Sequence, residues 1–151
     1  MLNGQGSYRK SAFALLLVVS LTAPALLLGC GGSTPESAVS KYFSAWQAGD
    51  WEAFKEAVVP QKLSKDQEAL AEEKFKQVKV KVDGLKMSTE FDKNDSSKAN
   101  VLLTDGKITY TAKILGETKT DTEDLTKVEK EFRTYTAVKV DGVWYVDTKL
   151  G

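Results

Sequence analysis

The hydrophobic period of the chain changes once, near Lys76, and this change constrains the fold more than any other feature of the sequence. Before Lys76, apolar residues recur at helical spacing, as from Val39 to Trp46. After Lys76, apolar and polar residues alternate in the manner of half-buried strands. Helices followed by a run of antiparallel strands predict an α+β domain, with the N-terminal helices packed on one face of an antiparallel sheet.

Capping signals predict three helices in the first part of the domain. Each helix starts after a residue whose side chain can accept a hydrogen bond from the first turn: Thr34, Asp50 and Ser64. Pro35 suits the first position of the first helix, and Gly49 is its stop signal. The second helix is expected to end at Pro60, and the third, which a capping box opens, is expected to extend to about Lys74.

The alternating part predicts strands that Asp-Gly pairs interrupt. The strands are expected at residues 78–82, 85–91, 99–103, 108–115, 132–140 and 143–146. Asp83-Gly84 and Asp105-Gly106 can each form a tight turn or a bulge, whereas Asp141-Gly142 is the clearest hairpin signal. Residues 116–127 are mostly polar and predict a long mobile connection. One face of the strand after them consists of Phe132, Thr134, Thr136, Val138 and Val140.

The composition excludes most catalytic and metal chemistry. The 151 residues include no histidine and one cysteine, which rules out His-dependent nucleophile systems, His-containing metal sites and an intramolecular disulfide. Lys plus Arg and Asp plus Glu each total 21, and this balance argues against a nucleic-acid partner. Asp83, Asp105 and Asp141 each precede a glycine, where a short side chain caps its own turn. We therefore predict no catalytic residue, no metal and no cofactor.

The first thirty residues have the layout of a secretory signal peptide. Arg9 and Lys10 form a positive region, which the uncharged residues 12–28 follow. The segment ends in Leu27-Leu28-Gly29-Cys30, with an aliphatic residue three positions before the cysteine and a small residue directly before it. This ending resembles the lipobox of bacterial lipoproteins. The alternative is an ordinary apolar membrane anchor that happens to end in a cysteine.

The lipobox resemblance implies cleavage between Gly29 and Cys30, with a diacylglycerol on the thiol of Cys30. Residues 1–29 are then the signal peptide, residues 30–34 a lipidated tether, and residues 35–151 the folded domain. Each buried methylene contributes about 0.8 kcal/mol, so two or three acyl chains hold a protein stably on a membrane. We therefore expect a lipoprotein of the cell envelope that is extracytoplasmic and contacts the membrane through the lipid on Cys30.

Two parts of the folded domain resemble nuclear-transport-factor-2-like domains, which have a cystatin-like fold. Residues 35–39 and 42–51 are similar to the first helix and the helix–helix corner of that family, and residues 141–147 are similar to its final hairpin. The resemblance, which covers residues 35 to about 147, implies a curved sheet that the helices close into a cone with a cavity. Enzymes of this fold place an aspartate or an Asp-His pair in the cavity, whereas many small lipoproteins with such a domain have no assigned function.

Aromatic side chains at helical and strand spacing form either the core of such a domain or, in part, the lining of a pocket. Because a cone needs a filled or liganded interior, we take Trp46, Tyr135 and Trp144 as candidate ligand-binding residues. Their ligand would be a small apolar molecule. An envelope protein bound against the open face of the sheet is the other expected partner.

A basic run joins the third helix to the first strand and consists of Lys74, Lys76, Lys79 and Lys81. The valines between the strand lysines alternate inward, so a solvated outer face explains the run, and a phosphate or membrane contact is the second interpretation. These features together predict a non-catalytic binding or accessory module of the cell envelope, not an enzyme. The alternatives are a small enzyme with a buried Asp/Tyr site in the cone cavity, and a structural spacer that holds a partner away from the membrane.

Overall fold

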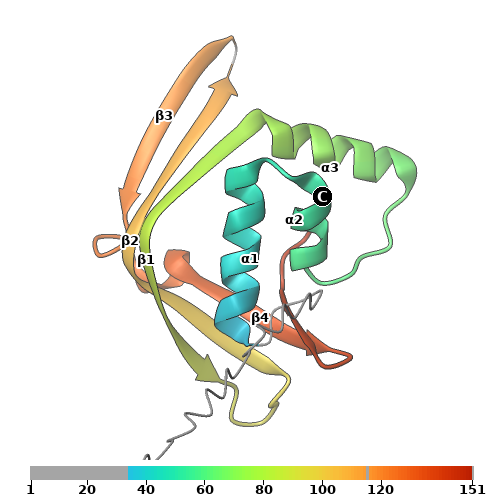
Figure 1. Ribbon diagram of the computed structural model, residues 1–151, viewed down its shortest axis with the longest axis vertical. Coiled ribbons are helices and arrows are strands. Elements are labelled where there is room, and N and C mark those ends of the chain that lie inside the picture. Colours follow the sequence, from blue (N-terminus) through green and yellow to red (C-terminus); the bar gives the residue numbers. More distant parts are fainter. Residues whose placement is uncertain (1–33, 115, 151) are drawn as a thin grey trace, which may run out of the picture.

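The computed structural model describes residues 34–114 and 116–150, so the predicted signal peptide, Gly29 and Cys30 lie outside the described residues. The described residues form an α+β domain in which the helices precede the strands, as the change of hydrophobic period predicts. The antiparallel sheet is strongly curled into a half-barrel, and helix α1 (Pro35–Ala48) lies against its concave side (Figure 1). The predicted α+β class, with N-terminal helices packed on a curved antiparallel sheet, is therefore confirmed.

Helix α1 is followed by α2 (Trp51–Ala57) and α3 (Lys65–Gln77). The predicted caps are confirmed, because a backbone N–H of the first turn donates to the side chain of each predicted N-cap residue: Thr34, Asp50 and Ser64. Gly49 ends α1 in the left-handed conformation, with a φ of 65°. Helix α3 continues past Lys74 to Gln77 and leads directly into the first strand without a connecting loop.

The sheet is built around one long strand. Its strands are β1 (Val78–Phe91), β2 (Lys98–Ile114), β3 (Glu117–Asp124), β4 (Thr134–Val140) and β5 (Val143–Val146), with a short 3-10 helix η1 (Lys130–Arg133) before β4. Strand β2 pairs with β1 over most of its length. Its first residues, 98–102, also pair with β4, and its last residues, 107–114, also pair with β3. Strand β5 follows β4 through the predicted hairpin at Asp141-Gly142.

The first two Asp-Gly pairs form an irregularity in the β1–β2 ladder instead of ending strands. Asp83 pairs with Lys107 and Lys86 pairs with Asp105, so the pairing register shifts between these two pairs. Both strands therefore continue past their Asp-Gly pairs, which form a bulge in the ladder. Gly106 has a φ of 121°, and a Cβ added there would lie 3.0 Å from the carbonyl oxygen of Asp83. The two strands approach so closely at this bulge that only glycine fits without displacement.

The prediction of a mobile connection at residues 116–127 is wrong, because most of this segment is strand β3. Seven of its eight residues are exposed, which explains why the segment shows no hydrophobic alternation. Its threonines instead pair with those of β2, with 2.9 Å between the hydroxyls of Thr109 and Thr122 and 3.1 Å between those of Thr111 and Thr120. The polar sequence therefore reflects an edge strand that is exposed on both faces.

The strand predicted at residues 132–140 starts at Thr134 instead of Phe132. The face that carries Tyr135 and Ala137 is the one that packs inward, not the predicted face of Phe132, Thr134, Thr136, Val138 and Val140. Phe132 lies in η1 with 73 % of its surface exposed. On β4, Ala137 is fully buried and Tyr135 is half-buried, whereas Thr136 and Val140 are exposed. The inward face packs against α1, where a small residue and a tyrosine fit between the helix and the sheet.

The core has two connected parts. The first lies between α1 and the concave side of the sheet and includes Val39, Phe43, Val101, Leu103, Ile108 and Val146. The second lies among the helices and contains Trp51, Phe54 and Phe75, whose rings lie within 6 Å of one another. Tyr42 and Trp46 of α1 pack against both parts. Aromatic side chains thus fill the space among the helices and, around Phe43 and Tyr135, part of the space between α1 and the sheet.

Candidate functional site

The structure brings two of the three predicted ligand-binding residues together. Trp46 and Tyr135 line one recess of about 100 Å³ between α1 and the concave side of the sheet, together with Tyr42, Phe43 and Tyr110. The ring of Tyr135 lies 5.3 Å from that of Phe43 and 5.9 Å from that of Tyr42. Pockets for drug-sized ligands measure about 300–1,000 Å³. The recess is therefore too small for such a ligand unless side chains move.

The recess gathers three tyrosines in an apolar setting. Burial raises the pKa of Tyr42, Tyr110 and Tyr135 above the ordinary value of a phenol. The pKa of Tyr135 rises furthest, first because of its burial and then because of the neighbouring phenols of Tyr110 and Tyr42. These phenols are therefore held in the neutral form, as hydrogen-bonding groups at the edge of an aromatic interior.

The raised tyrosine pKa values predict a loss of stability at high pH. Below a pKa of about 10, a phenol is neutral in both the folded and the unfolded chain. Above it, the unfolded chain releases the proton and the folded chain keeps it, so the free energy of unfolding falls by up to about 1.4 kcal/mol per pH unit for each such tyrosine. Urea unfolding at about pH 8 and about pH 11 measures this fall. The variant Tyr135→Phe should show a smaller fall, and equal falls in both proteins would contradict the assignment.

Trp144, the third predicted ligand-binding residue, lies elsewhere in the core. Only 5 % of its surface is exposed, and its ring lies 6.0 Å from that of Phe91 and 5.9 Å from the Nζ of Lys139. It does not line the recess of Trp46 and Tyr135. The side chain of Trp144 therefore packs β5 against the neighbouring strands.

The three predicted turn aspartates lie at bulges and turns. Asp83 pairs with Lys81 at 2.9 Å, and Asp105 pairs with Lys86 at 2.8 Å on either side of the β1–β2 bulge. Asp141 occupies the hairpin before β5 with a φ of 50°. None of these carboxylates lines the aromatic recess. Their positions fit the turn-capping role that their Asp-Gly sequences predict.

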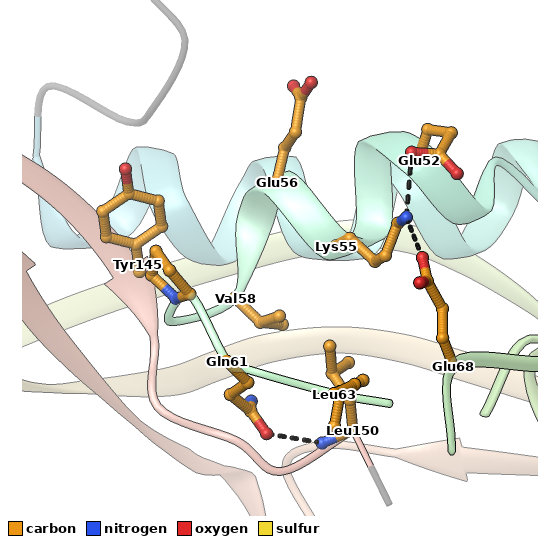
Figure 2. A pocket seen from close by; sticks show the side chains of 10 residues that line it. Glu52, Lys55, Glu56, Val58, Gln61, Leu63, Glu68, Tyr145 and Leu150 are labelled. Atoms are coloured by element: carbon orange, nitrogen blue, oxygen red, sulfur yellow. Dashed lines mark hydrogen bonds and ion pairs between the residues drawn. The ribbon is translucent and has the colours of Figure 1, made fainter. Parts of the chain in front are cut away.

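A second and larger hollow lies outside the core, between α2, the start of α3 and the C-terminal segment (Figure 2). This groove has a volume of about 490 Å³ and is open to solvent. Its apolar lining consists of Val58, Pro60, Leu63 and Leu150, with the ring of Tyr145 at one end. Three glutamates and one lysine complete the lining, so the rim is acidic: Glu52, Glu56, Glu68 and Lys55.

Lys55 is held between two of these glutamates. Its Nζ lies 3.0 Å from a carboxylate oxygen of Glu52 and also forms a hydrogen-bonded ion pair with Glu68, as Figure 2 shows. The hydrogen bond to Glu68, and next the one to Glu52, raises the pKa of the Lys55 ammonium. Glu56 points away from the groove and pairs with Lys41 at 3.4 Å. The ion pairs join the start of α3 to α2 and fix the acidic side of the groove.

Gln61 forms the opposite side of the groove by holding the C-terminal segment. Its side-chain N–H donates to the carbonyl oxygen of Thr148 over 2.6 Å, and its side-chain oxygen accepts from the N–H of Leu150 over 3.2 Å. One amide side chain thus pairs with both a carbonyl oxygen and an N–H of the C-terminal backbone. The edge of the groove therefore already holds one backbone segment through such paired hydrogen bonds.

Sequence reasoning missed this groove because its residues come from separate parts of the chain: α2, the connection to α3, and the last six described residues. The one local signal is the charged helical face that carries Glu52, Lys55 and Glu56 beside the apolar residues before Ser64. Within residues 34–114 and 116–150, no group of acidic side chains is arranged to hold a metal ion. In the same ranges, no helix has the length and apolar character needed to cross a membrane.

Comparison with known proteins identifies no relative of this chain. No protein-family model matches the chain, and no curated protein matches it at a significant level. The function is therefore argued from the sequence motifs and from the geometry of the recess and the groove.

Proposed function

We propose that this protein is a lipid-anchored, extracytoplasmic module of the cell envelope that binds a partner protein and does not turn over a substrate. The signal-peptide layout and the lipobox-like Leu27-Leu28-Gly29-Cys30 support the anchor, with the lipid on Cys30. Helices packed inside a curled sheet support the closer assignment to a nuclear-transport-factor-2-like cone. No charged residue among those described is buried, and the raised pKa values of the recess belong to tyrosines alone, which favours binding over catalysis.

The contrast between the two hollows carries the proposal. The recess between α1 and the sheet is about 100 Å³ because aromatic rings fill the space around it. The groove beside α2 is about 490 Å³, has an apolar floor and is open to solvent. A filled interior beside an open surface groove is suited to an extended segment of another protein more than to an enclosed small molecule.

The groove also indicates the chemistry of the bound segment. Its rim carries three glutamates against one lysine, and Lys55 is already neutralised by two of them. Its floor offers Leu63 and Val58 to an apolar side chain. The partner segment is therefore extended, with an apolar residue flanked by basic residues. Glu52, whose side chain is largely exposed on the rim, is the carboxylate that such a basic residue would meet first.

The aromatic filling of the interior also favours a second candidate function. A structural spacer, which only holds a partner away from the membrane, needs a filled core and no binding groove. The small recess suits this function as well as it suits a binding module. The groove beside α2 distinguishes the two, because a spacer would leave it without a partner.

Site-specific photo-cross-linking in the native host tests the proposal. A photoreactive phenylalanine analogue replaces Tyr145 at the end of the groove or, as the control, Phe132, which is an exposed aromatic residue of η1 that does not line the groove. We expect one discrete cross-linked protein from position 145 and none from position 132. Glu52→Gln should reduce the yield at position 145 several-fold, whereas Glu73→Gln, at an exposed acid of α3, should not.

Two results would contradict the proposed function. Cross-linking that is absent at both positions would favour the spacer. Metal- and cofactor-independent turnover by the folded domain in a broad hydrolase and isomerase screen would favour the enzyme with a buried Asp/Tyr site.

A further inference from the structure

A third hollow, of about 420 Å³, lies where α3 passes into β1, on the outer face of the sheet. It is lined by Lys76, Gln77, Lys79, Thr111, Lys113 and Thr118, together with Ala112. Three of these residues are lysines and none is acidic. The groove beside α2 has the opposite character, with three glutamates. The domain therefore concentrates positive charge around one hollow although its total charge is close to balanced.

The pairing register explains how the lysines meet. Lys79 of β1 lies opposite Thr111 of β2, and Lys113 lies two residues further along β2, on the same face. Residues in this diagonal relation lie about 7–8 Å apart, so Lys79 and Lys113 leave the same face of the sheet and both line the hollow. Lys76 approaches from the last turn of α3, where it pairs with Glu72 at 2.6 Å.

Lys79 and Lys113 carry charge that the described residues do not neutralise. Neither forms an ion pair in the described part of the chain, whereas Lys81, the next lysine along β1, pairs with Asp83. Two like charges at this separation repel each other, and an anion between them would remove the repulsion. The basic run in the sequence is thus more than a solvated face, because β2 contributes a further lysine from 34 residues beyond Lys79.

Hydroxyl groups line the same hollow. Thr118 of β3 lies opposite Lys113, and Thr111 lies between the two lysines, with its hydroxyl 3.1 Å from that of Thr120. Ammonium and hydroxyl donors that converge without a carboxylate are the chemistry that binds phosphate oxygens. We propose that this hollow, which we call the lysine hollow, binds the phosphate groups of an anionic ligand, with Lys79 and Lys113 as its principal contacts.

The position of the lysine hollow bears on the source of the phosphate. Helix α1 begins at the end of the domain that continues into the predicted tether, and the junction of α3 with β1 lies at the other end of α1 (Figure 1). The hollow thus lies at the end of the domain opposite to the start of α1, where the predicted tether joins. A soluble or polymeric phosphate compound therefore fits this position better than the headgroups of the anchoring membrane.

Affinity for inorganic polyphosphate tests the proposal on the full chain, purified in a non-ionic detergent. Fluorescence anisotropy of labelled polyphosphate compares the double variant Lys79→Gln/Lys113→Gln with Lys62→Gln/Lys127→Gln, which removes the same charge at exposed positions outside the hollow. We expect the affinity to fall about tenfold or more in the first variant and to stay within about twofold in the second. Absent binding by the wild-type chain, or equal losses in both variants, would overturn the proposal.

Chemical modification of the wild-type chain gives a second test that does not depend on the folding of a variant. Acetylation rates of Lys79 and Lys113 are compared with that of Lys62 by mass spectrometry. Slower acetylation of the two lysines when polyphosphate is added assigns the site to a soluble or polymeric phosphate. Slower acetylation on phosphatidylglycerol vesicles, relative to phosphatidylcholine vesicles, assigns it to headgroups. Unchanged rates in both comparisons would overturn the proposal. Neither test involves the groove, so the lysine hollow and the proposed function can fail separately.

Discussion

The variant Gly106→Ala is expected to lose about 3 kcal/mol of unfolding free energy, a large share of what a domain of this size has. Gly106 has a φ of 121°, where side chains other than hydrogen are strained. The new Cβ would also lie 3.0 Å from both the carbonyl oxygen of Asp83 and the Cα of Leu85. Both contacts are with backbone atoms, which cannot move aside as the end of a flexible side chain can. The β1–β2 ladder would have to open at the bulge.

Gly84→Ala is the matched control for this prediction. Gly84 belongs to the same bulge and has a φ of 64°, but an added Cβ there meets nothing within 4 Å. This variant should lose only about 1 kcal/mol, from backbone strain alone. Urea unfolding of residues 31–151, followed by tryptophan fluorescence, measures both losses. Similar losses of unfolding free energy in the two variants would contradict the prediction, because backbone strain alone would then explain both and the close contacts at Gly106 would add nothing.

The variant Cys30→Ala is expected to remove all fatty-acid labelling from the chain and to change its mass by the gain of residues 1–29 and the loss of the lipid. The lipobox-like sequence implies that the thiol of Cys30 carries the diacylglycerol and that cleavage takes place directly before it. Without the thiol, neither the lipid nor the processed N-terminus can form. Metabolic labelling with a fatty-acid analogue and intact-mass measurement of the membrane-bound chain read the two effects separately.

Two control variants make this prediction specific. Gly31→Ala leaves the lipobox-like sequence intact and should keep both the label and the mass of the wild-type chain. Cys30→Ala/Ser33→Cys restores a thiol three positions later and should regain neither. If the wild-type chain carried no label and kept residues 1–29, the segment would instead be an ordinary apolar anchor, and the proposed lipoprotein assignment would fail.

Local signals in the sequence predicted the helices better than the sheet. The starts of the helices depend on side chains such as Thr34 and Ser64, which bond to backbone groups only three residues away. The choice between a turn and a bulge at Asp105-Gly106 depends instead on β1, whose paired residues are about twenty positions distant in the chain. Strand β3 was missed because an edge strand with two exposed faces has no apolar side to bury.

The candidate sites show the same limit. Trp46 and Tyr135 were predicted to share a site and do line one recess, because the inward positions of α1 and β4 face each other. Trp144 was grouped with them because it is a large aromatic residue, but it packs against Phe91 in another part of the core. The groove beside α2 and the lysine hollow are each lined by residues from distant parts of the chain. No local pattern in the sequence predicts which distant segments come together.

The contact between α1 and β5 has a consequence for the order in which the chain folds. Val39 of the first helix and Val146 of the last strand belong to the same buried cluster. The N–H of Val59 also donates to the carbonyl oxygen of Val146 over 3.0 Å. The surface on which α1 packs is therefore completed only when β5 has been synthesised, and contacts between such distant residues form slowly. A growing chain that ends before β5 lacks the strand that closes this core, so α1 must wait for the rest of the domain before it can pack fully.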